Sequence, residues 1–337
     1  MLEGLRNLQM ASAPAQRRLH VNIVVLGGHG FLGQHLCRAL GTQPQYRVIA
    51  LSRQDGLDLR EFSCLAQCLQ DLKPEVIFNC AAHVGGVHYV STVPADVVHD
   101  NVTMALHLYR AVAKYCPTAH VVNPLSNCSY PGDTPLFVEH EWLNGDVHPS
   151  VYPYGHAKRM LYIIATCYKR QYGIRSTHFL VPNAFGPGDR TDPHLVHALN
   201  GMIIRMLHAW KNNQPTFEVW GSGCPIREWV YIEDAAAILM TALSLSDDVH
   251  EPINIAQNHG YSIQESAAMI AQAIPYTGVI TCNTHYQDGD PQKIMCDTKF
   301  RQVFPAFQFT DPFAAIRKTV NYYKTVLFND LKMKSMA

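Results

Sequence analysis

Two side chains of this sequence have the types and the spacing needed for proton transfer to a carbonyl group. Tyr154 and Lys158 stand four residues apart, so on a helix they share one face. A phenol ordinarily has a pKa of about 10, and a neighbouring cation favours the phenolate and lowers that pKa towards neutrality. Tyr154 is therefore a candidate general acid for the reduction of a ketone. Ser126 follows a run typical of a strand and is placed to hydrogen-bond the same carbonyl.

Short apolar runs alternate with helical patterns through the first half of the chain and must position these side chains. Runs typical of strands occur at residues 20–26, 47–51, 75–79, 120–123 and 176–181. Between them, apolar residues recur at spacings of three and four, which is typical of helices. Because the runs are apolar on both faces, they indicate a parallel sheet covered on both sides. We expect an α/β fold with a Rossmann-type doubly wound sheet.

A glycine-rich turn directly follows the first run. Gly27, Gly30 and Gly33 are spaced G-x-x-G-x-x-G and lead into a helical pattern. The first glycine permits a tight turn, the second lets the backbone approach a pyrophosphate, and the third allows helix and strand to pack closely. The anion then lies at the helix N-terminus. A lone glycine motif is weak evidence, but this strand–turn–helix context predicts a dinucleotide site.

The end of the second run indicates which dinucleotide fits. An NAD-specific site places an acid there for the ribose 2′-hydroxyl, whereas this chain has Ser52 and Arg53. A hydroxyl and a guanidinium suit a 2′-phosphate, so we expect NADP (NADPH) rather than NAD. An ordinary surface arginine is the alternative. Asp58 and Leu59 are candidates for contact with the adenine.

The regular alternation of strand and helix patterns ends after Asn183. The run Gly186-Pro187-Gly188-Asp189 is a break, and helical patterns follow at 195–211, 234–245 and 263–273. We therefore expect an N-terminal tail at 1–19, a dinucleotide-binding domain at 20–185, and a lobe at 186–330 that mainly binds substrate. A crossover back to the main sheet is expected around residues 229–232.

Composition excludes several other classes of protein. Lys and Arg together number 27, as do Asp and Glu, and this balance argues against a dedicated nucleic-acid binder. The ten cysteines form no C-x-x-C pair and no Cys/His cluster of zinc type, so we expect no metal and reduced thiols in a cytoplasmic protein. No segment approaches the roughly 18 consecutive apolar residues that span a bilayer.

Five stretches of the chain resemble the extended short-chain dehydrogenase/reductase family, and within it the GDP-L-fucose synthases. They are AAHVGG at 81–86, SNCSYP at 126–131, PYGHAK at 153–158, PNAFGP at 182–187 and WGSGCPIRE at 220–228. The resemblance covers residues 21–325. It implies that Ser126, Tyr154 and Lys158 form a reductase triad, and that Cys128 and His194 are the acid and base of an epimerisation. A thiol and an imidazole, with ordinary pKa values of about 8.5 and 6.5, suit that pair of proton transfers.

The resemblance also assigns binding residues. Besides the glycine turn, the residues at the end of the second run, and Tyr154 and Lys158, those expected at the dinucleotide are Phe31, Leu32, Ala81, Ala82, His83, Pro182, Asn183 and Phe185. Those expected at the substrate are Val87, Asn127, Asn183, His194, Leu195, Arg205, Trp220, Arg227 and Lys293. Among them, the guanidinium of Arg227 can neutralise a phosphate through a bidentate contact.

This chain departs from the pattern of the synthases at several positions. Asn127 stands where they have a second serine, and Met202 stands where a basic group for the diphosphate is expected, eight residues past His194. Arg205 lies one helical turn further on and is a substitute. Tyr89-Val90-Ser91 also differs from the usual continuation. These differences leave the sugar and the nucleotide base open.

The leading hypothesis is an NADPH-dependent epimerase-reductase of a nucleotide-linked 4-keto-6-deoxy sugar, with a GDP-sugar favoured. Two alternatives stay open: a C4 reductase or C3/C5 epimerase of a related nucleotide-hexose or -heptose, and a non-catalytic nucleotide sensor. The helical patterns at 95–115 and 154–171 look like the pair that family members use to build a four-helix dimer interface, so a homodimer is expected.

Overall fold

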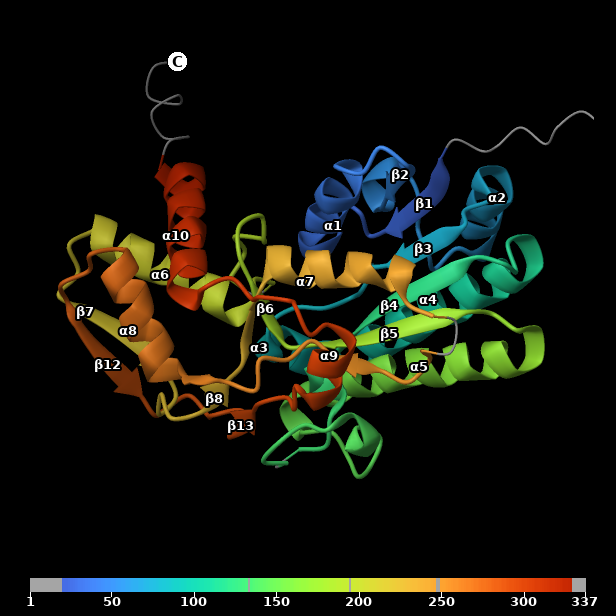
Figure 1. Cartoon of the computed structure of the whole chain (residues 1–337). Helices are drawn as coiled ribbons and strands as arrows, with labels where there is room; N and C mark the ends of the chain where they lie inside the picture. The colour runs from blue at the N-terminus through green and yellow to red at the C-terminus, as the bar shows by residue number, and fades with distance from the viewer. Residues whose placement is uncertain (1–19, 133, 194, 247–248, 329–337) are drawn as a thin grey trace, which may run out of the picture.

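Six parallel strands form the central sheet of the molecule, in the order β10-β5-β4-β3-β1-β2 (Figure 1). The structure is a computed structural model that describes residues 20–132, 134–193, 195–246 and 249–328. The strands are β1 (Val21–Leu26), β2 (Tyr46–Leu51), β3 (Val76–Asn79), β4 (His120–Ser126), β5 (Ser176–Val181) and β10 (Ile253–Asn254). All five strands expected from the sequence are present, and the prediction of a Rossmann-type parallel sheet is confirmed.

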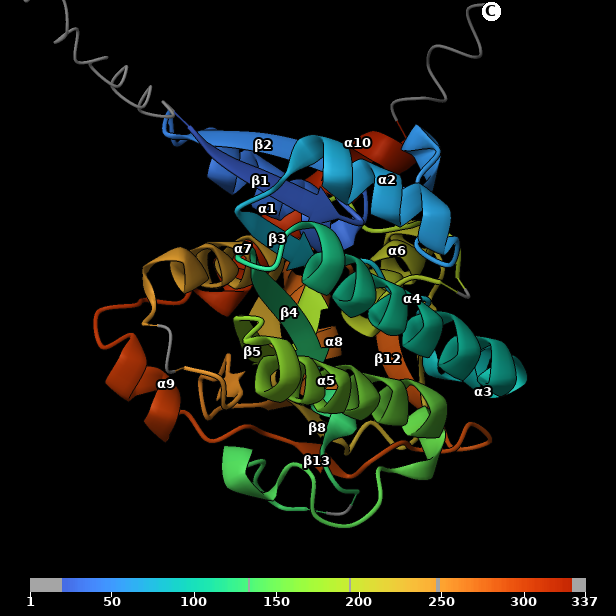
Figure 2. The same ribbon diagram turned by 90° about the vertical axis from the view of Figure 1, so that its right-hand side faces the viewer.

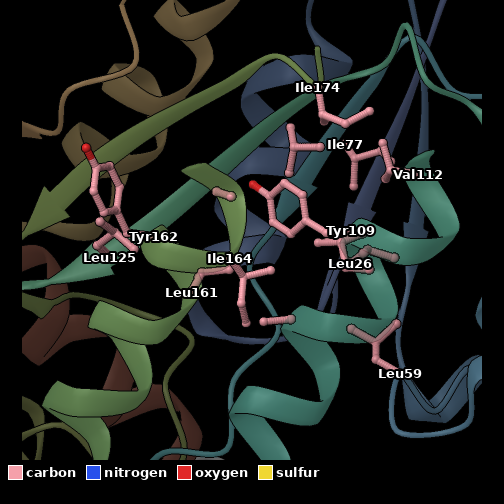
Figure 3. Packing of buried hydrophobic residues seen from close by; sticks show 14 of the residues in the cluster. Leu26, Leu59, Ile77, Tyr109, Val112, Leu125, Leu161, Tyr162, Ile164 and Ile174 are labelled. Carbon is pink, nitrogen blue, oxygen red and sulfur yellow. The ribbon is translucent and has the colours of Figure 1, made fainter. Parts of the chain in front are cut away.

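Helices cover both faces of this sheet because its strands are apolar on both sides. On β1, Ile23 and Val25 pack with α1 and α7, whereas Val24 and Leu26 pack with α2, α4 and α5. Figure 3 shows the second packing around Tyr109 of α4, and Figure 2 shows α4 and α5 side by side. These helices are α1 (Phe31–Gly41), α2 (Phe62–Leu72), α4 (Pro94–Tyr115), α5 (Tyr152–Tyr172) and α7 (Ile232–Met240), with the short α3 (Val87–Thr92) before α4 and α9 (Thr298–Val303) next to β10.

A second group of elements forms a lobe with its own apolar core, in which α6, α8 and α10 pack together (Figure 1). Its helices are α6 (Ala198–Lys211), α8 (Ile263–Ala273) and α10 (Pro312–Phe328). Its strands are β7 (Thr216–Trp220) with β12 (Val279–Asn283), and β11 (Tyr261–Ser262), β8 (Ile226–Arg227) and β13 (Gln292–Lys293) as a small sheet. Between lobe and sheet, β6 (Asn183–Phe185) pairs with β9 (Trp229–Tyr231).

The predicted crossover at 229–232 is wrong in its position. Residues 229–231 form β9, which pairs with β6, and the chain returns to the main sheet at β10 beside β5. An apolar run indicates a buried strand but does not say which sheet it joins. The division at 185/186 stays a prediction. Helix α7 and strand β10 come after it in the chain, but they pack on the main sheet.

Two helices after residue 186 also differ from their predicted bounds, whereas α8 matches. The helix expected from 195 begins at Ala198, because the N–H groups of Leu195 and Val196 bond to the carbonyl of Asp192 in a separate turn. The helix expected at 234–245 runs from Ile232 to Met240, and a 3₁₀ turn follows at Thr241–Ser244.

Candidate active site

The sheet brings the predicted residues together at the carboxyl ends of its strands. The order of the strands reverses at β1, with β2 on one side and β3 on the other. In doubly wound sheets, ligands bind in the crevice at such a reversal. The glycine turn follows β1, Ala81 and Ala82 follow β3, and Ser126 ends β4, so segments far apart in sequence meet at this edge.

The glycine turn has the backbone that a dinucleotide requires. Gly27 has a φ of +74°, a region that other residues rarely adopt, and a Cβ there would lie 2.7 Å from the amide nitrogen of Ala81. A Cβ on Gly33 would overlap the carbonyl of Gly27. Helix α1 begins with Gly30 as its N-cap and no side chain caps it, so the first-turn N–H groups can bind an anion. These features fit a pyrophosphate.

At the end of β2, a carboxylate that sequence reasoning missed organises the turn. Asp55 accepts hydrogen bonds from the Ser52 amide at 2.8 Å and the Ser52 hydroxyl at 3.1 Å, and it pairs with His29 at 3.0 Å. Arg53 lies between Ser52 and Asp55 in the sequence, and its side chain is exposed. The spacing Ser-x-x-Asp resembles a capping box and was the signal available in the sequence. The acid is thus occupied locally while the guanidinium faces outward.

Asp58 and Leu59, the candidates for adenine contact, are both engaged within the protein. The guanidinium of Arg60 lies 2.6 Å from the Asp58 carboxylate and holds the pKa of that carboxyl at about 2. Arg60 also reaches Asp100 at 3.2 Å. The Leu59 side chain is buried in the core, and its carbonyl bonds to His107. Asp58 is partly buried and remains the more accessible of the two.

Tyr154 and Lys158 both lie in α5 and share a face, as their spacing predicts. The Lys158 ammonium donates to the carbonyl of Pro124 at 2.9 Å and lies 5.5 Å from the centre of the Tyr154 ring. Burial lowers the pKa of Lys158 to about 8. Burial and the nearby Cys128 sulfur raise the pKa of Tyr154.

The expected lowering of the tyrosine pKa is therefore not found among the residues of this chain. Desolvation of the phenolate is the largest cause of the raised pKa, and the ammonium of Lys158 is itself buried and bonded to Pro124. The phenol remains protonated at neutral pH. That is the form a general acid must have before a ketone is reduced.

The turn after β4 places a serine and a thiol against the start of α5. The Ser126 hydroxyl oxygen accepts from the amide of Cys128 at 3.2 Å, which leaves its proton free to donate to a ligand. A Cβ on Gly155 would overlap the Cys128 carbonyl, so the absent side chain allows this close contact. Asn127 is buried, and its Nδ2 has no hydrogen-bond partner among the residues that the structure describes.

Two cations from neighbouring strands lie near this thiol. Lys293 is buried, and its Nζ lies 3.9 Å from the Cys128 sulfur. Arg227 is opposite Lys293 in the β8–β13 register, and burial lowers its pKa while nearby Asp290, Cys128 and Asp288 favour its charged form. The arrangement suits an anionic sulfur or an anionic substrate.

Glu228, within the run WGSGCPIRE, was given no role by the sequence. Its carboxylate is fully buried and accepts from the amides of Gln257 at 2.5 Å and Met295 at 2.8 Å. Burial raises its pKa to about 7. Its own carbonyl accepts from the Asn183 side chain at 3.2 Å. Glu228 thus joins the segments that carry several candidate substrate residues.

An aromatic and cationic group lies further out in the lobe. Arg205 is 4.0 Å from the centre of the Trp220 ring, and its Nη1 donates to the Glu218 carbonyl at 2.9 Å. Tyr286, which the sequence did not single out, stacks on Trp220 at 5.2 Å, and both rings are about half exposed. Met202 is buried in the lobe core on the apolar side of α6, so it faces away from solvent.

The other predicted residues differ in their surroundings. His83 is fixed between Asp100 at 2.9 Å and the Tyr89 hydroxyl at 2.8 Å. The side chains of Pro182 and Phe185 are buried, and that of Val87 is exposed at the start of α3. His194 lies outside the described residues. Those that are partly buried are Phe31, Leu32, Ala81, Ala82, Asn183 and Leu195.

Comparison with known proteins identifies the family. Residues 23–256 match the model of the NAD dependent epimerase/dehydratase family. The chain belongs to this family. It is 30% identical to a probable GDP-L-fucose synthase of Drosophila melanogaster, over 89% of this chain and 96% of the relative, and 28% identical to the GDP-L-fucose synthase of Escherichia coli (strain K12), over 83% and 90%.

A solved structure agrees with these relatives. The GDP-L-fucose synthetase of Naegleria fowleri bound to NADP has a TM-score of 0.80 and 27% identity, covering 94% of this chain and 96% of that one. The resemblance stated from the motifs is confirmed. Within the described residues, no group of His, Cys, Asp or Glu could hold a metal ion, and no helix is long and apolar enough to cross a membrane.

Proposed function

We propose that the protein is an NADPH-dependent epimerase-reductase that converts a GDP-linked 4-keto-6-deoxy sugar by inversion at C3 and C5 and reduction at C4. One observation carries the proposal: Cys128 lies near enough to Tyr154 to raise the pKa of its phenol, and the Cys128 amide donates to Ser126 at 3.2 Å, so groups for both reactions lie together where β4 ends. The relatives from Drosophila melanogaster and Escherichia coli, matched over most of their length, bear the name GDP-L-fucose synthase.

The reduction uses the residues at the ends of β4 and α5. The glycine turn, Ser52 and Arg53 would hold NADPH, which would supply the hydride. Tyr154 donates its proton to the C4 carbonyl oxygen, and the Ser126 hydroxyl hydrogen-bonds that oxygen as it becomes negative. Lys158, anchored on Pro124 at 2.9 Å, keeps a cation beneath the tyrosine ring.

The epimerisation uses the acidity that a 4-keto group gives to the protons on C3 and C5. One group must remove each proton, and another must return a proton from the opposite face of the ring. Cys128 is assigned one of these roles and His194 the other. Arg227 and Trp220 hold the diphosphate end of the sugar nucleotide, with Arg205 against the indole.

We further propose that the protein is a cytoplasmic homodimer in which α4 and α5 of two copies pack together. Four non-aromatic apolar side chains on these helices are 37–46% exposed: Val98, Leu106, Met160 and Ile163. Figure 2 shows the two helices lying side by side, as a shared face requires. Introducing charge with Leu106→Glu and Ile163→Glu should yield monomers in light scattering, and an unchanged mass would exclude this interface.

The proposed function is tested by incubating the protein with NADPH and GDP-4-keto-6-deoxymannose in deuterated water. Loss of NADPH absorbance with deuterium at both C3 and C5 is expected. Oxidation without label would mean a C4 reductase, and binding without turnover would mean a sensor. Cys128→Ser should abolish the label yet spare hydride transfer to an intermediate that is already epimerised. Equal loss of both steps would remove Cys128 from the epimerisation.

A further inference from the structure

We propose that Lys293 is a positioning residue whose ammonium holds the Cys128 sulfur as the anionic proton acceptor of the epimerisation. The role of Lys293 in the epimerisation rests on the proposed function, whereas its contact with Cys128 does not. Sequence reasoning placed Lys293 at the substrate. The structure places its Nζ 3.9 Å from the thiol sulfur, donating to it.

The lysine has little freedom to act elsewhere. Its side chain is 5% exposed, and it comes from a strand 165 residues away from the cysteine. A buried ammonium needs an acceptor or a counter-charge, because desolvation penalises an isolated ion heavily. A thiolate supplies both.

The backbone around Lys293 is fixed at two points by Glu228. The amide of Glu228 donates to the Lys293 carbonyl at 3.0 Å, and the Glu228 carboxylate accepts from Met295, two residues further on, at 2.8 Å. Strand β13 therefore keeps its register against β8. The direction of the Lys293 side chain follows from that register.

The other charges around the thiol act on it less directly than Lys293. Arg227 lies opposite on β8, and Asp290, Cys128 and Asp288 all favour its charged form, so its charge is shared between the sulfur and two carboxylates. Asp290 is itself buried. On the side of α5, the phenol of Tyr154 is close enough to feel the sulfur, and burial keeps this phenol neutral. Lys293 donates directly to the sulfur.

The proposed step balances as a simple proton transfer. The C–H bond next to the 4-keto group breaks, its electron pair moves into the carbonyl to give an enolate, and the proton forms an S–H bond on Cys128. The sulfur must be anionic to accept it, and a cation within about 4 Å favours that form. A proton returned to the opposite face of the carbon completes the inversion.

The test measures alkylation of Cys128 by iodoacetamide against pH, resolved by peptide mass spectrometry, without any substrate. In Lys293→Met the rate at pH 7 should fall about tenfold and the profile should move to higher pH, because the thiolate loses its cation. Lys293→Arg should stay close to wild type. The exposed Cys64 and Cys167 serve as internal references in each sample.

A matched control removes another lysine, Lys299, which is half-buried. Lys299 donates to the carbonyls of Glu251 and Pro252, so Lys299→Met should leave Cys128 alkylation unchanged. An unchanged Cys128 profile in folded Lys293→Met, with only a raised KM for the sugar nucleotide, would overturn the inference and make Lys293 a phosphate ligand. If Lys293→Met does not fold, a Lys293→Gln profile equal to that of Lys293→Arg overturns it equally.

The alkylation result is independent of the reaction. Failure of the wild type to turn over the sugar nucleotide would end the proposed function and leave the Lys293–Cys128 contact standing. In an active enzyme, Lys293→Met should lose deuterium exchange about tenfold and spare reduction of the epimerised intermediate, whereas equal loss of both steps would count against the positioning role.

Discussion

The two reactive groups of the site are built in different ways. Tyr154 and Lys158 lie one turn apart in a single helix, and the lysine is anchored on the adjoining strand β4. Cys128, in contrast, meets a lysine that is 165 residues away, delivered by a two-residue strand whose register depends on Glu228. The first arrangement follows from local helix geometry, whereas the second exists only when the lobe is folded against the sheet.

Tyr154→Phe is the sharpest test of the local arrangement. Without the phenolic proton, ketone reduction should fall about 10²- to 10⁴-fold, which is the usual contribution of a general acid. Deuterium exchange at C3 and C5 should persist, because Cys128 and its contact with Lys293 are intact. Single-turnover NADPH oxidation and mass spectrometry measure the two steps. Loss of both would mean that the two groups act as one unit.

Arg227→Met tests the lobe side of the comparison. Hydrogen bonds to charged groups contribute about 1.5–3 kcal/mol, so the KM for the sugar nucleotide should rise roughly 10- to 100-fold. The Kd for NADPH, measured by fluorescence, should not change. Arg205→Met is the companion variant, and its effect should be smaller since its guanidinium packs on Trp220. A weaker NADPH complex in Arg227→Met would contradict the separation of the two halves.

Arg53→Ala is the mirror experiment on the dinucleotide side. Loss of one charge-assisted contact with the 2′-phosphate should weaken NADPH binding about tenfold and leave NADH binding unchanged. Titration of both dinucleotides measures this. Arg38→Ala is the control, because Arg38 bonds to Gln34 on the surface of α1. Equal effects on NADPH and NADH would show that Arg53 does not select the phosphate.

A histidine cluster under α5 should make the sheet half sensitive to acid. Burial lowers the pKa of His178 well below its usual value, and His250 and His120 nearby lower it further, as does Lys169. In acid, His178 is therefore protonated in the unfolded chain but not in the folded one. The free energy of unfolding thus falls as the pH drops below about 6.5.

The expected size of this effect is about 1 kcal/mol between pH 6.5 and 5.5 for one such histidine. Urea unfolding at the two pH values measures it. His178→Gln should flatten the pH dependence, and Thr166, which bonds to His250 at 3.0 Å, offers Thr166→Val as a neighbouring control that keeps His178. A pH-independent wild type would mean that His178 binds a proton as readily in the folded chain as in the unfolded one.

The sequence by itself determined the sheet, the glycine turn and the Tyr154–Lys158 pair. Each depends on local rules: apolar runs make strands, glycine permits a φ of +74° at Gly27, and residues four apart share a helix face. The capping spacing of Ser52 and Asp55 was also present in the sequence, although it was not used.

Only the tertiary structure decided which strand returns to the main sheet, that Leu59 and Met202 are buried in cores, that burial raises the pKa of Tyr154, and that Lys293 contacts Cys128. The physical reason is common to all four. Burial and long-range contact depend on what packs against a residue, and no local pattern carries that information.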